Sequence, residues 1–83
     1  MIKVLFAEFV EKGLIQVEFS NGLSGSFNLR SYLENHSGVL LEQLNDETFA
    51  KRCFIDAGAL CWPNGLELSP NRLYELCSLS KAA

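Results

Sequence analysis

Apolar and polar positions alternate along the first third of the chain with the two-residue period of β-strands. Residues 14–20 and 23–28 each predict a strand with one apolar and one polar face. Residues 2–10 are apolar in both phases of the alternation, so this strand is expected to be partly covered on both faces. One of its faces holds Ile2, Val4 and Phe6, and the other holds Leu5, Ala7 and Phe9.

Two dipeptides predict the turns that join these three strands. Lys12-Gly13 predicts a two-residue turn, and Asn21-Gly22 is the preferred pair for a type I′ hairpin. The first third of the chain is therefore predicted to be a three-stranded antiparallel meander.

The middle of the chain predicts short helices. Asn28 is expected to cap a helical turn over residues 28–33, and Val39-Leu40-Leu41 is expected to return to the core. A further helix is expected to open at Asn45-Asp46-Glu47, with a capping side chain and acids at its positive end, and to end near Lys51-Arg52. If Asn45 is the N-cap, Leu44 and Phe49 form the apolar pair of a hydrophobic staple.

The closing stretch from Cys61 to Pro70 predicts the end of a strand and the start of a helix. Residues 53–56 and 59–62 are expected to form a second hairpin that turns at Ala57-Gly58 and ends at Pro63, which has no N–H to donate. Ser69 and Pro70 have the residue types of an N-cap and a first helical position. The inward stripe of this last helix is Leu73, Leu76 and Cys77, with Tyr74 at its edge, and Ser80 to Ala83 should fray.

Length and composition place these elements in one small globular unit. The chain has 83 residues, of which 48% are apolar and 20% charged. We expect a single α+β domain over residues 1–83: a three-stranded antiparallel meander, a short helix, a second β-hairpin and a C-terminal helix packed on the sheet. Its stability should be about 5 kcal/mol.

The net charge of −3 argues against direct binding of nucleic acid and against docking on anionic lipid. Four cations, Arg30, Lys51, Arg52 and Arg72, make a poor footprint for nucleic acid, even with Tyr32 or Tyr74 available for stacking. The sequence contains neither an apolar run long enough to span a membrane nor a secretory pattern, so a cytoplasmic location is expected.

Residues that could carry chemistry are few and scattered. Cys53, Cys61 and Cys77 lack metal-knuckle spacing and are expected to be core filler or inert thiols. His36 is expected to be a solvated loop residue. The acids Asp46, Glu47, Asp56 and Glu67 are expected to be solvated charges, and the sequence has no phosphate-binding glycine motif. We therefore expect no enzymatic activity and no cofactor.

Four segments of the chain form a recognisable set. They are Val17-Glu18-Phe19-Ser20-Asn21-Gly22, Phe27-Asn28-Leu29-Arg30, Leu44 to Phe49, and Trp62-Pro63-Asn64-Gly65-Leu66-Glu67-Leu68-Ser69-Pro70-Asn71-Arg72-Leu73-Tyr74. Together they resemble the small bacterial domain-of-unknown-function family 2442. The family pattern usually has Asp where this chain has Asn28 and Glu67. The resemblance implies an α+β fold and no established activity, and it implies an accessory protein found near small toxin-like partners.

From these observations we expect a non-enzymatic cytoplasmic binding module, an accessory or regulatory partner of another small protein. The alternatives are a partner of a nucleic-acid-binding regulator and a small-molecule binding domain, and a homodimer stays open. Side-chain types enriched in interface hot spots predict the contact residues. These are Arg30, Tyr32, Trp62, Arg72 and Tyr74. For Trp62 and Tyr74 the alternative is that they pack the last helix on the sheet.

Overall fold

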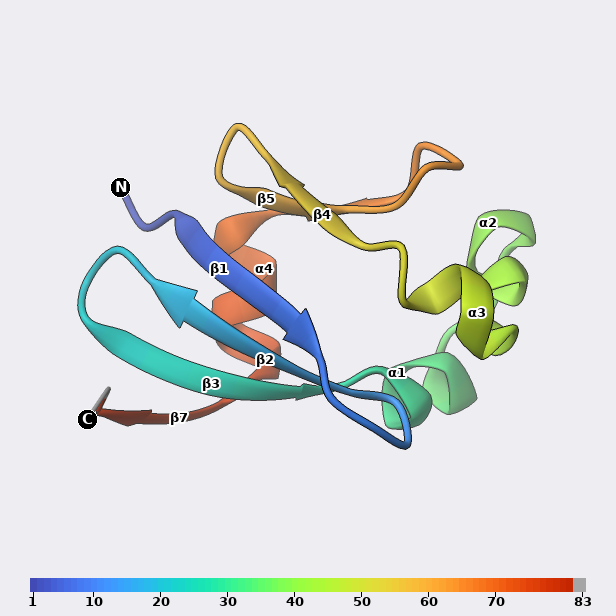
Figure 1. The fold of residues 1–83 in the computed structure, drawn as a ribbon, viewed down its shortest axis with the longest axis horizontal. Coiled ribbons are helices and arrows are strands. Elements are labelled where there is room, and N and C mark those ends of the chain that lie inside the picture. The colour runs from blue at the N-terminus through green and yellow to red at the C-terminus, as the bar shows by residue number, and fades with distance from the viewer. Residues whose placement is uncertain (82–83) are drawn as a thin grey trace.

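Two antiparallel sheets and a set of short helices surround one apolar core (Figure 1). The structure is a computed structural model and describes residues 1–81, with side chains through Ser78. The first sheet has the order β1-β2-β3-β7 and the second the order β4-β5-β6. The strands are β1 (Val4–Phe9), β2 (Leu14–Phe19), β3 (Leu23–Asn28), β4 (Phe54–Asp56), β5 (Ala59–Cys61), β6 (Glu67–Leu68) and β7 (Ser78–Lys81).

The helices lie behind the first sheet and at one end of it. Figure 1 shows α4 behind the meander, while the other helices group at the end where β3 runs into α1. The helices are α1 (Leu29–Asn35), α2 (Val39–Glu42), α3 (Glu47–Ala50) and α4 (Pro70–Leu76), and η1 (Gln43–Asn45) is a 3-10 turn between α2 and α3. The α+β class and the order of elements expected from the sequence are confirmed.

The meander is confirmed, but the type of its second turn is not. The chain reverses after Phe19 with a hydrogen bond from the Gly22 N–H to the Phe19 carbonyl, 3.1 Å long. Gly22 has φ +88°, whereas Asn21 is not among the residues with positive φ. A type I′ turn needs positive φ at both central residues, so the type I′ prediction is wrong. Lys12 and Gly13 both have positive φ, at 51° and 78°.

A β-bulge in β1 overturns the expected faces of the first strand. Val4 pairs with Phe19 and Phe6 pairs with Glu18, so Leu5 is an extra residue without a counterpart on β2. The extra residue shifts the alternation by one, because the side-chain period of a strand is two. Val4 is buried before the bulge, while Ala7 and Phe9 pack against the core after it.

The core is built from both sheets and from α4. Trp62 is 1% exposed, and its indole N–H donates a 2.9 Å hydrogen bond to the Ala50 carbonyl, which joins the end of β5 to α3. Leu73 of α4 is fully buried in the same cluster. The other buried apolar residues of the cluster are Val4, Ile15, Val17, Phe19, Phe27, Leu29, Leu44, Ala50, Leu60 and Leu68.

Side-chain caps fix where the helices begin. Asn28 caps α1 by accepting from the Ser31 N–H, and Ser69 caps α4 by accepting from the Arg72 N–H, with Pro70 in the first turn. Both caps are confirmed. The cap of α3 is Asp46, whose side chain accepts from the Thr48 N–H.

The helix opens within Asn45-Asp46-Glu47 as expected, but its cap is Asp46, so the condition for the Leu44–Phe49 staple, Asn45 as the N-cap, is not met. Asn45 ends the 3-10 turn that precedes α3. Leu44 and Phe49 are respectively buried and partly buried, but they do not occupy the two staple positions of a helix capped by Asp46.

Two further expectations are corrected, and one short strand, β6 at residues 67–68, has no counterpart among the strands expected from the sequence. Val39 and Leu40 are 79% and 40% exposed, so the segment expected to return to the core lies largely at the surface. Ser80 and Lys81, expected to fray, belong to β7, which pairs with β3, and the same expectation for residues 82–83 lies outside the described residues.

Candidate functional site

The five residues expected to contact a partner are divided between two helices and the core. Arg30 and Tyr32 lie on α1, Arg72 and Tyr74 lie on α4, and Trp62 follows β5. Arg30 and Arg72 are exposed. Trp62 cannot take part in a surface contact in this structure because it is almost fully buried and its one polar group is already bonded.

The two tyrosines have mainly structural neighbours. Tyr74 meets Phe19 edge-on, with ring centroids 5.1 Å apart, and its hydroxyl accepts from Asn21 Nδ2 at 3.2 Å. Tyr32 meets Phe27 edge-on and stacks on His36, with centroids 5.6 Å and 4.1 Å apart. Both tyrosines are half-buried, so only part of each ring is open to a partner.

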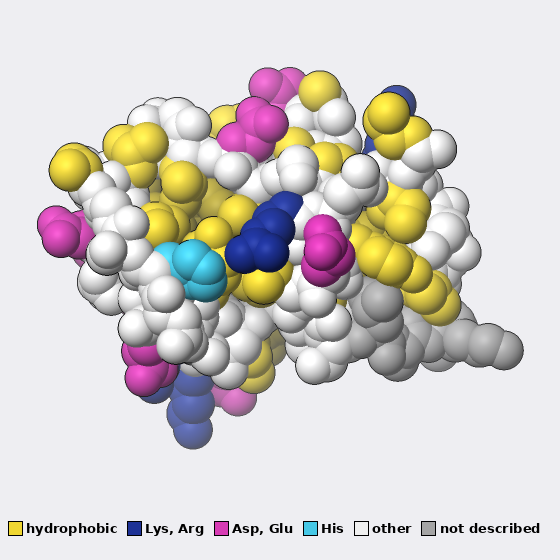
Figure 2. All heavy atoms as spheres, turned by 180° about the vertical axis from the view of Figure 1, so that it is seen from behind, with side chains coloured by type: hydrophobic (Ala, Val, Ile, Leu, Met, Phe, Trp, Pro, Cys, Tyr) yellow, Lys and Arg dark blue, Asp and Glu magenta, His cyan; other side chains and the backbone are white. Residues whose placement is uncertain are grey.

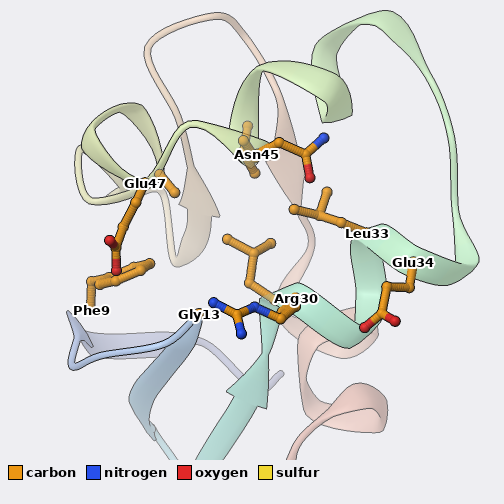
Figure 3. A pocket seen from close by; sticks show the side chains of 10 residues that line it. Phe9, Gly13, Arg30, Leu33, Glu34, Asn45 and Glu47 are labelled. Atoms are coloured by element: carbon orange, nitrogen blue, oxygen red, sulfur yellow. The ribbon is translucent and has the colours of Figure 1, made fainter.

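An open pocket of about 350 Å³ lies between α1, α3 and the turn that joins β1 to β2 (Figure 3). In Figure 3, Arg30 and Glu34 enter from α1, and Glu47 enters from α3 on the other side. These three charged side chains make no ion pair with one another in the described part of the chain. The apolar lining of the pocket is Phe9, Leu29, Leu33, Leu44 and Ala50.

Gly13 allows the turn between β1 and β2 to lie close to the start of α1 at one side of this pocket. Gly13 has φ +78°, and a Cβ at this position would lie 3.0 Å from the Cβ of Arg30. Its carbonyl accepts a 2.8 Å hydrogen bond from the N–H of Leu29. The turn is thereby held against the start of α1. The pocket has an apolar floor and a polar rim, which suits a small molecule or one side chain of a partner.

The three thiols are free and weakly acidic. Cys61 is buried, while Cys53 and Cys77 are half-buried. Burial raises the pKa of Cys77 to about 11 and also raises the pKa of Cys53. Burial, followed by the nearby carboxylates of Glu67 and Asp56, raises the pKa of Cys61. A thiol with a raised pKa stays protonated near neutral pH and is a poor nucleophile.

The described residues contain neither a cluster of metal ligands nor a membrane-spanning helix. No group of three or more His, Cys, Asp or Glu side chains is arranged to hold a metal ion within that part of the chain. No helix there has the length and apolar character to cross a membrane. His36 is exposed, and its Nδ1 lies 3.0 Å from the Tyr32 carbonyl.

The surface feature that sequence patterning missed is a group of exposed apolar side chains where the two sheets meet. β1 and β4 contact each other, and the Val4 N–H donates a 2.8 Å hydrogen bond to the Gly58 carbonyl. Leu5, Phe6 and Phe54 on these two strands are 64%, 48% and 46% exposed. We call these three residues the seam patch.

The strand registers place the seam patch on the side of the sheets that faces away from the core. Phe6 pairs with Glu18, whereas the next pair along the strands, Ala7 and Val17, faces the core. In the second sheet Ile55 pairs with the buried Leu60, so its neighbour Phe54 lies on the opposite face. The bulge at Leu5 turns Phe6 to the outer face. The sequence gives no sign of this bulge, because residues 4–7 are all apolar.

Carboxylates surround the seam patch. Glu8 lies two residues after Phe6 on the same face of β1, and Glu18 is the cross-strand partner of Phe6. Asp56 lies two residues after Phe54, so it shares that outer face. All three acids are exposed.

Comparison with protein families places most of the chain in a known family. The family model described as "Protein of unknown function (DUF2442)" matches residues 7–78. No curated protein and no solved structure matches the chain.

Proposed function

The chain belongs to DUF2442, a family whose description assigns no function, and we propose that it is a non-enzymatic binding module that acts as an accessory or regulatory partner of another protein. The observation that carries the proposal is the seam patch. Bulky apolar side chains exposed on adjoining strands are characteristic of protein–protein contact sites, since solvent exposure of such side chains is unfavourable.

The distribution of charge supports a protein partner over direct nucleic-acid binding. The net charge is −3. On the face seen in Figure 2 the Lys and Arg side chains are separated from one another and do not form a stripe. A partner that itself binds nucleic acid is compatible with the proposal, and its identity would follow from the capture experiment below.

Affinity capture from cells that express the chain tests this function. The bait is compared with a Leu5→Ser/Phe6→Ser variant and with a matched control, Val39→Ser/Leu40→Ser, which removes two exposed apolar side chains from α2. We expect one protein to be enriched on the wild-type and control baits and lost from the seam variant. Equal enrichment on all three baits, or none on any, contradicts the proposal. A cytoplasmic location is part of the same proposal, and fractionation of these cells checks it.

A small-molecule function is the second candidate because the pocket between α1 and α3 has a volume in the range of ligand sites. Ligand-detected NMR with mixtures of small metabolites tests it. A Leu33→Trp variant should fill the pocket and abolish any signal, while Leu5→Trp should not, because Leu5 lies outside the pocket. Binding that survives Leu33→Trp would place the ligand elsewhere.

A further inference from the structure

We propose that the seam patch binds a basic segment of a partner protein, in which Lys or Arg side chains accompany apolar ones. This inference rests on the proposed function and adds the chemistry of the partner. The apolar centre of the surface is formed by Leu5, Phe6 and Phe54, which are partly open to solvent on two strands that contact each other.

The charges around this centre are mainly negative and come from both sheets. Glu8 and Glu18 belong to the outer face of the first sheet, and Asp56 and Glu67 belong to the outer face of the second. All four side chains are exposed, and none is paired with a cation within the described residues.

Burial is the main cause of the raised pKa of Cys61, and the negative charges of Glu67 and Asp56 on the same face of the second sheet raise it further. Two exposed cations lie near the patch along the chain. The aliphatic stem of Lys3 runs along Gly58, where a Cβ would lie 2.9 Å from the Lys3 Cβ, and Arg52 precedes Phe54 by two residues. The four carboxylates thus outnumber these two cations. An apolar surface ringed by carboxylates favours a partner that presents cations around its own apolar groups.

A second copy of the chain fits this surface poorly. In a twofold dimer the same patch faces itself, so the carboxylates of one copy would lie opposite those of the other. Like charges placed opposite each other at an interface disfavour the pairing. The partner is therefore a basic segment of another protein, and self-association would appear as a dimer in sedimentation.

Fluorescence anisotropy with defined peptides tests the inference. The probe is a short fluorescein-labelled peptide in which Lys alternates with Phe and Val, and the comparison probe has Glu in place of Lys. We expect the Lys peptide to bind at least about tenfold more tightly than the Glu peptide and to weaken as salt is raised.

Charge-reversal variants assign the preference to the seam. Glu8→Lys/Asp56→Lys should lower affinity for the Lys peptide about tenfold. The control Glu42→Lys/Glu75→Lys makes the same change in net charge on α2 and α4, and it should leave affinity within about twofold of wild type.

The inference is overturned if the two peptides bind equally or if neither binds. It is also overturned if both reversal variants lose affinity equally, or if sedimentation shows a dimer that Phe6→Ser abolishes. If Phe6→Ser removes the partner captured from cells while reversal of the acids changes nothing, the binding function stands and the basic partner is rejected. If the capture experiment shows no dependence on Phe6, the function itself fails.

Discussion

Replacing Trp62 with Ala should remove most of the stability of this domain. The side chain is 1% exposed, and burying an indole removes about 150–250 Å² from water. At about 25 cal/mol per Å² this corresponds to about 4–6 kcal/mol, close to the cost of about 3–5 kcal/mol typical of Trp→Ala in a core. Loss of the 2.9 Å bond to the Ala50 carbonyl adds about 1 kcal/mol.

Against a total of about 5 kcal/mol, the variant should be largely unfolded at room temperature. Trp62→Phe keeps most of the apolar volume and should cost about 1–3 kcal/mol, which lowers the melting temperature by about 4–8 °C for each kcal/mol.

Circular dichroism against temperature and urea measures both variants, because the fluorescence probe is lost with the indole. Phe54→Ala is the control for removal of an aromatic ring, and it should cost about 1 kcal/mol or less since Phe54 is half exposed. If Trp62→Ala unfolds cooperatively within about 2 °C of wild type, the assignment of Trp62 as the central core residue is refuted.

Two other substitutions and one deletion test separate parts of the structure. Gly13→Ala should destabilise more than Gly22→Ala in thermal melts, because both positions have positive φ but only Gly13 would bring a Cβ against Arg30; equal losses would remove the steric argument. Burial raises the pKa of Cys77 from 9.0 to about 11, so the folded state holds this proton more tightly and stability falls as pH rises through that window. Urea titrations should show a shallower fall in Cys77→Ala than in wild type, and parallel curves would contradict it. Deletion of Leu5 should leave the chain folded, because it removes the extra residue and keeps the inward positions of β1 inward; a collapse in the far-ultraviolet spectrum would show that the bulge is needed for folding.

Local chemistry predicted those parts of the fold that depend on neighbours in sequence. The residue types of Asn28 and Ser69 predict helix caps, because their side chains can accept a hydrogen bond from an amide three residues along the chain. The structure confirms both hydrogen bonds. Asn45 and Asp46 both have the residue type of a cap for α3. Asn45 belongs to the preceding 3-10 turn, so Asp46 is the cap, and sequence propensity does not reveal that turn.

Features that depend on distant parts of the chain were missed. The bulge at Leu5 is set by the register with β2, and the residues around it are apolar in either phase. β7 was missed because Ser78–Lys81 has little strand character of its own and is a strand through its pairing with β3. The predicted contact residues followed hot-spot composition, which selected the buried Trp62 and overlooked the exposed Leu5, Phe6 and Phe54.

The most direct test of the central claim is an NMR titration of the isotope-labelled chain with the Lys-containing peptide. The claim is that the surface where the two sheets meet is the binding surface. We expect the backbone amide shifts to concentrate in residues 4–9 and 54–56. Shifts concentrated in α1 and α3 around the pocket, with β1 and β4 unchanged, would contradict it.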